Sequence, residues 1–267
     1  MKVQNKVIVV TGGGSGIGRE LVLNLLSRGA RVVAVDLNET TLEETATLAG
    51  NNKHALTTYV ADLTNRASVE AFAEKTIARL GVVDGIINNA GIIQPFIKVA
   101  ELDFELIERV INVNFYGTLY MVKAFLPHLL TRPEAHIVNI SSMGGFLPVP
   151  GQTIYGASKA AVKLLTEGLH SELGNTNVKV TVVFPGAVKT NISKNSGINN
   201  PRQADGDNKT MKVLSAVKAA QIIIDGMEQD KYRVLVGKDA KFLDLFSRFN
   251  PKSAASFIAD KMKQLVK

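Results

Sequence analysis

The stretch 6–18 reads KVIVVTGGGSGIG, a short apolar run followed directly by a glycine-rich turn. Ile17, Leu21 and Leu25 then recur every four residues, which predicts that a helix begins within the turn. A strand, a glycine-rich turn and a helix in this order can bind a pyrophosphate, because glycine lets the backbone approach it and the helix N-terminus attracts its charge. The glycines are spaced Gly-x-x-x-Gly-x-Gly, so an ordinary tight turn is the alternative.

The next predicted strand ends in an acid. Residues 31–35 read RVVAV and are followed by Asp36. An acid at the end of the second strand, about twenty residues past the glycines, is where the 2′-hydroxyl of a nucleotide ribose is bound. Asp36 would repel a 2′-phosphate, and no Arg or Lys stands at 13–15 or 37–38 to bind one. The pattern favours NAD over NADP; the alternative is that Asp36 simply begins a turn.

Predicted strands and helices alternate along the rest of the chain, and no internal repeat or linker interrupts them. Strands are predicted at 55–60, 82–88, 135–140, 178–184 and 232–236, and helices at 39–49, 66–80, 104–130, 154–173 and 213–228. Such alternation implies right-handed crossovers and a parallel sheet covered by helices on both faces. We therefore predict one α/β domain over residues 1–238, built on seven strands.

The stretch 155–159 reads YGASK and carries the candidate catalytic pair. Tyr155 and Lys159 are about one helical turn apart, so they should share a helix face. An ammonium beside a phenol stabilises the phenolate and lowers the tyrosine pKa from about 10, which makes Tyr155 a usable general acid or base. Ser142, at the end of a predicted strand, could hydrogen-bond the reacting oxygen. Taken alone, Tyr-x-x-x-Lys is common by chance, so two ordinary surface residues are the alternative.

Several of these candidates should meet at one edge of the sheet. In open α/β sheets, ligands bind beyond the carboxyl ends of the strands. The glycine turn, Asp36, Asn89 and Ser142 all follow predicted strands and are expected there. Asn114 lies inside an apolar helical stretch, where an amide is costly unless it is hydrogen-bonded; a buried amide at a helix bend would explain it.

Composition limits the classes of function. The 267 residues include no Cys, which excludes disulfides, a thiolate nucleophile and a cysteine metal site. We expect no metal, no signal peptide, no membrane span and a reducing, cytoplasmic location. The formal net charge is +7, but residues 231–267 alone hold nine Lys or Arg against three Asp. Because the rest of the chain is close to neutral, no nucleic-acid partner is expected.

Two segments stand apart from the alternating pattern. Residues 191–212 are polar, as expected for a lid or mobile loop. Residues 239–267 form two helical stretches broken at Asn250-Pro251, with basic residues interleaved among apolar ones. The apolar residues are Phe242, Leu245, Phe246, Phe249, Phe257, Ile258, Met262 and Leu265. This pattern resembles an interfacial amphipathic hairpin that contacts a membrane peripherally. The alternatives are that it packs on the domain, closes the substrate cleft or meets another subunit.

The motifs together resemble the classical short-chain dehydrogenases/reductases. They are TGGGSGIG at 11–18, NNAG at 88–91, Asn114 with Gly117, Ser142, YGASK at 155–159, and Pro185-Gly186 with Thr190. The resemblance covers residues 5–237 and implies a doubly wound (Rossmann) parallel seven-stranded sheet, here with a C-terminal helical extension over 239–267. It implies that Tyr155 is the general acid/base and that Ser142 orients the substrate oxygen. Lys159 would lower the Tyr155 pKa and bind the nicotinamide ribose, and Asn114 would kink its helix and hold a water in a proton relay.

The resemblance also implies the residues that bind the cofactor and the substrate. Asp62 and Leu63 match contacts to the adenine, Asn89 a contact to the nucleotide, and Val188 and Thr190 contacts to the carboxamide. The full cofactor set is Gly12, Ser15, Gly16, Ile17, Gly18, Asp36, Asp62, Leu63, Asn89, Ala90, Gly91, Tyr155, Lys159, Val188 and Thr190. The substrate set is Ser142, Met143, Phe146 and Tyr155, with Ile93, Leu147 and Val149 as further apolar candidates.

We therefore expect an NAD(H)-dependent oxidoreductase that interconverts a secondary alcohol and a ketone on an apolar, lipid-like or steroid-like substrate. The alternatives are an NADPH-dependent 3-oxoacyl-type reductase and a non-catalytic NAD(H)-binding regulatory protein. A homo-oligomer is expected. Many family members end soon after the seventh strand, in a segment that forms a tetramer contact. Here the basic extension follows instead, so a dimer is at least as well supported as a tetramer.

Overall fold

A computed structural model describes residues 1–198 and 213–263, and its centre is a seven-stranded parallel sheet. The strand order is β3-β2-β1-β4-β5-β6-β9, which confirms the predicted doubly wound α/β fold. The strands are β1 (Val7–Thr11), β2 (Arg31–Asp36), β3 (Leu56–Val60), β4 (Gly85–Asn88), β5 (Ala135–Ile140), β6 (Val178–Pro185) and β9 (Arg233–Val236). The order reverses between β1 and β4, so this is where the sheet opens a crevice for a ligand.

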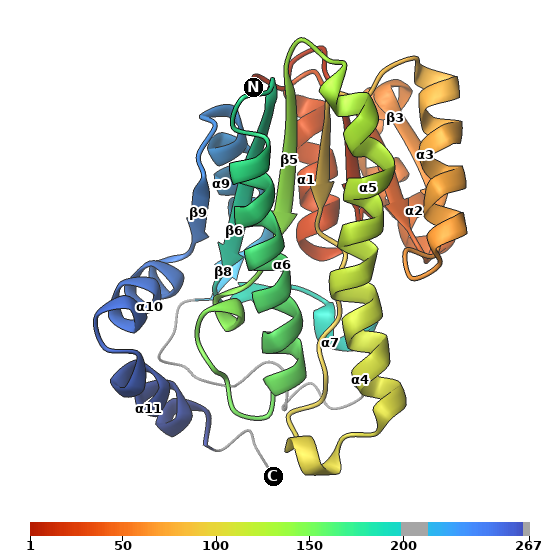
Figure 1. Ribbon diagram of the computed structural model, residues 1–267. Helices are drawn as coiled ribbons and strands as arrows, with labels where there is room; N and C mark the ends of the chain where they lie inside the picture. Colours follow the sequence, from red (N-terminus) through yellow and green to blue (C-terminus); the bar gives the residue numbers. More distant parts are fainter. Residues whose placement is uncertain (199–212, 264–267) are drawn as a thin grey trace.

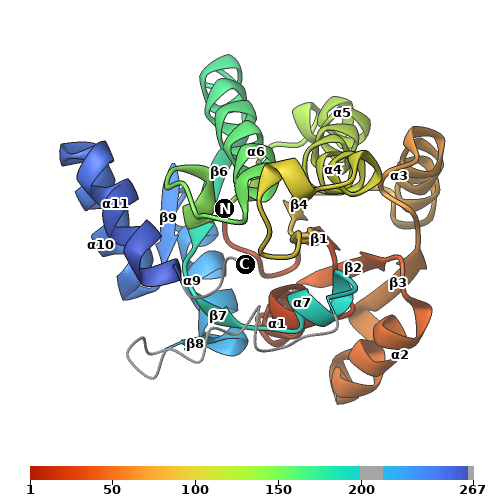
Figure 2. The ribbon, with the colours of Figure 1, turned by 90° about the horizontal axis from the view of Figure 1, so that it is seen from below.

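Helices cover both faces of the sheet, as Figures 1 and 2 show. One face is packed by α1 (Gly16–Ser27), α2 (Glu39–Leu48) and α9 (Ala216–Glu228). The other is packed by α3 (Arg66–Leu80), α5 (Gly117–Leu130) and α6 (Thr153–Glu172). β1 is buried on both sides, because Ile8 and Val10 point into the first layer while Val7 and Val9 point into the second. An apolar run without polar alternation is what such a central strand requires.

Two predicted elements differ from those observed. The strand predicted at 82–88 begins only at Gly85, because the buried Asp84 accepts hydrogen bonds at the end of the sheet. Its carboxylate binds the Val7 N–H at 2.9 Å and Arg132 Nε at 2.9 Å. The helix predicted at 104–130 is divided into α4 (Phe104–Ile111), a π-turn η3 (Asn112–Tyr116) and α5. A π-turn adds one residue to a helical turn and often marks a functional position.

Shorter elements connect the main ones. η1 (Gly50–Ala55) leads into β3 at the amino ends of the strands, and the others lie at the carboxyl ends: η2 (Val99–Glu101), η4 (Met143–Gly145), β7 (Val188–Lys189), α7 (Ile192–Asn195) and β8 (Leu214–Ser215). β7 and β8 pair in parallel as a second, two-stranded sheet that was not predicted. Of the predicted lid at 191–212, α7 is described, whereas 199–212 lie outside the described residues.

The C-terminal extension forms α10 (Lys238–Phe249) and α11 (Pro251–Met262), which lie beside the edge strand β9 (Figure 2). Leu243 of α10 and Ala254 and Ile258 of α11 pack on Leu147, just after η4. One apolar side of the extension therefore packs on the domain; the predicted Leu265 lies outside the described residues. Within 1–198 and 213–263, no helix is long and apolar enough to cross a membrane.

Candidate active site

A cleft of about 820 Å³ runs along the carboxyl ends of the strands. The predicted residues that line it are Gly12, Ser15, Gly16, Ile17, Asp36, Asp62, Leu63, Asn89, Ala90, Gly91, Ile93, Ser142, Tyr155, Lys159, Val188 and Thr190. They come from stretches spread over most of the chain, and the topology brings them to one surface. The cleft is continuous from Asp36 at one end to Ser142 and Tyr155 at the other.

The glycine turn is shaped by close backbone contacts. A Cβ atom at Gly18 would collide with the carbonyl oxygen of Gly12, so Gly18 packs behind the cleft and does not line it. Gly12 and Gly16 have φ values of +67° and +53°, which favour glycine. Ser15 is the N-cap of α1, but its side chain accepts no N–H from the helix. The first turn of α1 therefore opens toward the cleft, as an anion site requires.

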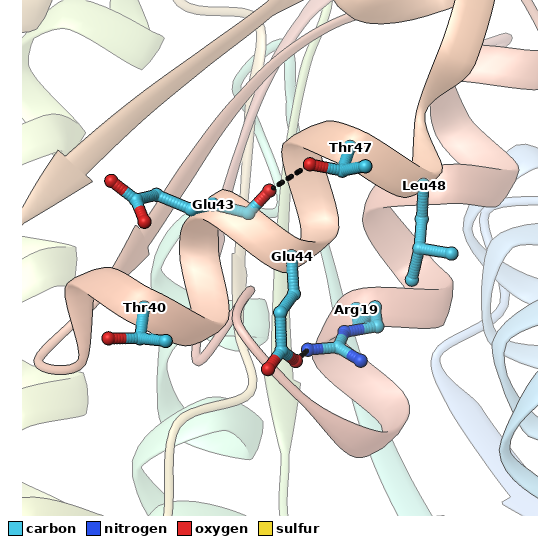
Figure 3. A pocket seen from close by; sticks show the side chains of 6 residues that line it. All are labelled: Arg19, Thr40, Glu43, Glu44, Thr47 and Leu48. Carbon is cyan, nitrogen blue, oxygen red and sulfur yellow. Dashed lines mark hydrogen bonds and ion pairs between the residues drawn. The ribbon is translucent and has the colours of Figure 1, made fainter.

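Arg19 connects the glycine turn to α2, and Figure 3 shows its side chain paired with that of Glu44. Its Nη2 donates to the carbonyl oxygen of Gly14 at 2.6 Å and pairs with Glu44 of α2. Its Nε also donates to Gly14 and to the Thr45 hydroxyl, at 3.0 and 3.1 Å. The guanidinium is thus held by acceptors on the turn and on α2. Arg19 acts as a structural clamp between α1, α2 and the glycine turn.

Asp36 lies at the end of β2 with both carboxylate oxygens engaged by backbone donors. Oδ2 accepts the N–H of Gly14 at 3.0 Å, and Oδ1 accepts the N–H of Asn38 at 3.1 Å. These bonds fix the carboxylate beside the glycine turn. Carboxylate oxygens have further lone pairs, so Asp36 can still accept hydrogen bonds from a ligand in the cleft. Asp36 also accepts the N–H of Asn38, so the alternative that it begins a turn is compatible with this geometry.

Thr11 connects the carboxyl ends of β1 and β4. Its hydroxyl accepts the N–H groups of Asn89 and Ala90 at 2.9 and 3.0 Å, and the Asn89 amide donates to the Thr11 carbonyl at 3.0 Å. A Cβ atom at Gly91 would lie 3.1 Å from both Asn114 Oδ1 and Lys159 Nζ. The NNAG stretch therefore forms the floor of the cleft between the glycine turn and the catalytic helix.

Tyr155 and Lys159 lie on the first turns of α6, beside Ser142 after β5. Burial raises the pKa of Tyr155, and the hydrogen bond between Tyr155 and Ser142 lowers it by less. Lys159 Nζ donates to the carbonyl oxygen of Ile140 at 3.0 Å, and the stabilisation of a Tyr155 phenolate by its ammonium stays a prediction. Burial also lowers the pKa of Lys159 to about 8. Tyr155 is therefore a protonated phenol at neutral pH, poised as an acid.

Asn114 is fully buried in the π-turn η3, and its amide is satisfied on both sides. Oδ1 accepts the Ile92 N–H at 2.8 Å, while Nδ2 donates to the Ile92 carbonyl at 3.0 Å and to Ser158 Oγ at 2.9 Å. The amide thus joins the loop after β4 to the catalytic helix. The helix distortion expected at Asn114 is present; its role in a water relay stays a prediction.

Gln94 is a site residue that sequence reasoning missed. It is fully buried, and its Oε1 accepts the N–H groups of Ile154 and Tyr155, both at 3.0 Å. Its Nε2 donates to the Gly151 carbonyl at 3.0 Å. Gln152, the local N-cap of α6, makes no side-chain cap bond of its own. No motif marks Gln94, because a long-range cap leaves no spacing pattern in the sequence.

Other predicted residues lie away from the cleft. Met143, Phe146 and Leu147 pack in the cluster with α10 and α11, and neither they nor Val149 line the cleft. The predicted Ile93 and Val188 do line it, and Ile92, Val113 and Ile192 add to the apolar lining. Asn195 of α7 also lines the cleft and donates to Ser15 Oγ at 2.7 Å. No motif in the sequence marked Ile92, Val113, Ile192 or Asn195.

The comparisons with known proteins agree with this geometry. The family model described as short chain dehydrogenase matches residues 6–201. The chain belongs to the short-chain dehydrogenase family. This short-chain dehydrogenase is 37% identical to SadH of Mycobacterium tuberculosis, whose name describes it as an oxidoreductase, over 96% of this chain and 95% of SadH.

Two solved structures have the same fold as this short-chain dehydrogenase. A short-chain dehydrogenase/reductase of Burkholderia phymatum in complex with NAD is 29% identical, with a TM-score of 0.81, covering 88% of this chain and 90% of its own. A short-chain dehydrogenase of Burkholderia cenocepacia in complex with NADP is 26% identical, with a TM-score of 0.80, covering 97% and 99%. The family therefore establishes an oxidoreductase with a nucleotide-binding fold, and its relatives use either cofactor.

The cleft of this short-chain dehydrogenase fits a dinucleotide. Gly12, Gly16 and Gly91 leave the backbone exposed along its floor, and the open first turn of α1 can take a pyrophosphate. Asp36 would hold the adenosine ribose, and Tyr155 and Lys159 the nicotinamide end. In the described part of the chain, no group of three or more His, Asp or Glu side chains is placed to hold a metal ion.

Proposed function

We propose that this enzyme is an NAD(H)-dependent oxidoreductase that interconverts a secondary alcohol and a ketone. The observation that carries the proposal is the single continuous cleft, which has Asp36 at one end and Ser142, Tyr155 and Lys159 at the other. A dinucleotide bound along it would bring its nicotinamide to the catalytic side chains. A non-catalytic, NAD(H)-sensing protein would have no need for all three side chains in one place.

Tyr155 moves the proton in this proposal. In the direction of ketone reduction, its protonated phenol donates to the substrate oxygen; in the direction of oxidation, the phenolate takes the hydroxyl proton. Ser142 hydrogen-bonds the same oxygen and the Tyr155 phenol, which holds both in position. The Lys159 ammonium stabilises the phenolate that remains after proton transfer. When bound, NAD(H) supplies the group that accepts or donates the hydride.

Asp36 supports NAD as the preferred cofactor. Its carboxylate is fixed by the N–H groups of Gly14 and Asn38, so it cannot easily turn away from a 2′-phosphate. The next residue, Leu37, is exposed and apolar, and Arg19 is already engaged by Gly14 and Glu44. A 2′-phosphate would therefore meet a fixed negative charge beside the glycine turn.

The substrate class follows from the lining near Tyr155. Ile92, Ile93 and Ile192 present apolar side chains to the cleft. Such a surface favours an aliphatic, lipid-like or steroid-like alcohol over a sugar or an amino acid. The 3-oxoacyl-type reductase remains the rival, since an acyl chain would also suit this surface; it differs in needing NADPH.

Fluorescence titration of the purified enzyme with NADH and with NADPH distinguishes the NAD(H)-dependent dehydrogenase from the NADPH-dependent acyl reductase. We expect NADH to bind at least about tenfold more tightly than NADPH. NADPH would lose one charge-assisted hydrogen bond to Asp36, and its 2′-phosphate would be repelled by the carboxylate. A preference of that size for NADPH would sink the proposal and favour the acyl reductase.

A panel of apolar secondary alcohols and ketones, followed by NADH absorbance, tests the reaction itself. We expect turnover by the wild-type enzyme and its loss in Tyr155→Phe, which keeps the ring but removes the proton donor. NADH affinity should stay within about threefold in that variant, because the ring is retained. Binding without any turnover across the panel would instead support the regulatory protein.

A further inference from the structure

The outer face of α10 exposes three large apolar side chains. Phe242, Leu245 and Phe249 are 57%, 58% and 82% exposed, and their spacing of three and four residues places them on one side of the helix. The opposite side is already used, because Leu243 packs on Leu147. The exposed side is continued by Phe257 of α11, whose ring centroid lies 6.3 Å from that of Phe242. The two helices thus share one exposed aromatic face.

The exposed charged side chains of the two helices are mostly basic, and Lys261 Nζ lies 5.8 Å from the centroid of the Phe257 ring. Between Lys238 and Lys263, the exposed charged residues are Lys238, Lys241, Arg248, Lys252, Asp260, Lys261 and Lys263. Asp244 is buried and pairs with Arg233 at 2.7 Å and with Arg248 at 3.1 Å. Asp239 accepts the Ala187 N–H at 2.7 Å. Asp260 is therefore the only exposed acid of the hairpin in its described part.

The hairpin also lies next to the entrance side of the active site. Its inner side contacts Met143, Phe146 and Leu147, which directly follow the catalytic Ser142. Figures 1 and 2 show α10 and α11 beyond β9, at the end of the sheet where the strands terminate. A surface that held the hairpin would lie close to η4, the segment that directly follows Ser142.

We propose that the outer face of α10 and α11 binds the surface of a membrane that contains anionic lipid. Aromatic and leucine side chains can insert between headgroups, while flanking Lys and Arg attract anionic lipid. A second copy of the chain fits this face less well, because a twofold contact would bring two sets of cations together. Binding would place the cleft where a membrane-dissolved alcohol or ketone could enter; the lipid binding itself does not depend on the proposed activity.

Co-sedimentation of the full chain with phosphatidylcholine vesicles, with and without phosphatidylserine, tests the proposal. Substitutions are used in place of truncation, because removing α10 would expose Leu147. We expect binding only when phosphatidylserine is present, and weaker binding as salt is raised. Phe242→Ser/Leu245→Ser/Phe249→Ser should lower the partition coefficient by about 100-fold, since each side chain loses apolar burial in the interface. Lys241→Gln/Lys252→Gln should lower it by about tenfold.

Matched control variants carry the same changes elsewhere on the surface. Leu48→Ser/Val60→Ser/Val99→Ser removes three other exposed apolar side chains, and Lys53→Gln/Lys75→Gln removes two other exposed cations. Both should bind vesicles like the wild type, and circular dichroism should show all variants folded. Equal binding by the α10 variants and their controls would overturn the proposal, as would a wild type that ignores phosphatidylserine. The face would instead be a subunit contact if the wild type is a dimer that does not bind vesicles and the α10 variant is a monomer.

Discussion

Burial shifts the pKa values of Tyr155 and Lys159 in opposite directions. Burial disfavours the charged form of each group, so the pKa of Tyr155 rises and that of Lys159 falls to about 8. Tyr155 therefore holds its proton over the neutral range, while Lys159 can lose its own within a unit of neutral pH. The charge on Lys159, rather than that on Tyr155, is the one that ordinary changes of pH should alter.

The reduction reaction should therefore slow as pH rises through about 8. Above that value Lys159 is neutral and no longer stabilises the phenolate left on Tyr155, so kcat/KM for NADH should fall by about tenfold per pH unit. In Lys159→Arg the guanidinium stays charged, and the fall near pH 8 should disappear whatever activity remains. Steady-state kinetics from pH 6 to 10 gives both profiles; the same break in wild type and variant would assign it to another group.

Asp36 and Leu37 should together control the choice of cofactor. Replacing the carboxylate removes the repulsion of a 2′-phosphate, and an arginine at 37 supplies a cation beside it. Asp36→Ser/Leu37→Arg should weaken NADH about tenfold and favour NADPH over NADH by about tenfold. Titration by fluorescence measures both affinities. Asp36→Asn, which keeps one of the two acceptor oxygens and removes the charge, is the matched control and should lose discrimination without gaining NADPH affinity.

Single residues of the site were predictable when a local motif marked them. Asp36, Ser142, Tyr155 and Lys159 each stand at a strand end or within a helical turn, and the structure brings them to one cleft. The direction of the Tyr155 pKa shift was not predictable, because it depends on the burial of the phenol and on its hydrogen bond with Ser142. Spacing along a chain carries no information about either.

At the scale of elements, α6 is positioned by a residue outside itself. The first N–H groups of a helix have no partner within it, and Gln94 supplies the acceptor for those of Ile154 and Tyr155. The loop after β4 therefore fixes the end of the helix that carries Tyr155. Asn114 adds a second connection from the same loop, through Ile92, to Ser158 of α6.

Gln94→Leu should disturb both stability and catalysis. It leaves two helical N–H groups and the Gly151 carbonyl without their partner, so we expect a loss of about 2 kcal/mol in the free energy of unfolding. The start of α6 would shift, and kcat should fall by about tenfold with little change in the KM for NADH. Gln94→Glu keeps the acceptor at the helix N-terminus and should restore most of kcat. Urea unfolding and steady-state kinetics check these values; an unchanged kcat in the folded Leu variant would limit Gln94 to a structural role.

Elements were predicted well where one periodicity ran unbroken. The helix α3 and the strand β5 match their predicted ranges. The helix at 104–130 is divided because Asn114 bonds Ile92 in the distant loop after β4. The assignment of Met143 and Phe146 to the substrate set stays a prediction; both are half-buried and pack against the C-terminal hairpin, a contact that no sequence pattern indicated.

At the scale of the whole molecule, the exposed apolar side chains fall into separate regions. One is the face of α10 and α11, beside the edge strand β9. Another is on the layer formed by α5 and α6, where Leu164 of α6 is 69% exposed and Leu130 of α5 is 44% exposed. These helices cover the same face of the sheet (Figure 1), away from the cleft at its end. A single chain would leave both regions in water, so each is best explained by a separate contact.

We expect the α5 and α6 layer to form the contact of a homodimer. Large apolar side chains on two neighbouring helices can supply the buried centre of an interface of roughly 800 Å² per subunit. Leu164→Glu would place a charge in that centre and should raise the dimer dissociation constant by at least about 100-fold. Leu48→Glu makes the same change at an exposed leucine on the opposite layer and should leave the dimer intact. Sedimentation velocity over a concentration series measures both variants. A wild type that stays monomeric at every concentration would refute the homodimer. A dimer that survives Leu164→Glu would place the subunit contact elsewhere, with the α10 and α11 face as the next candidate.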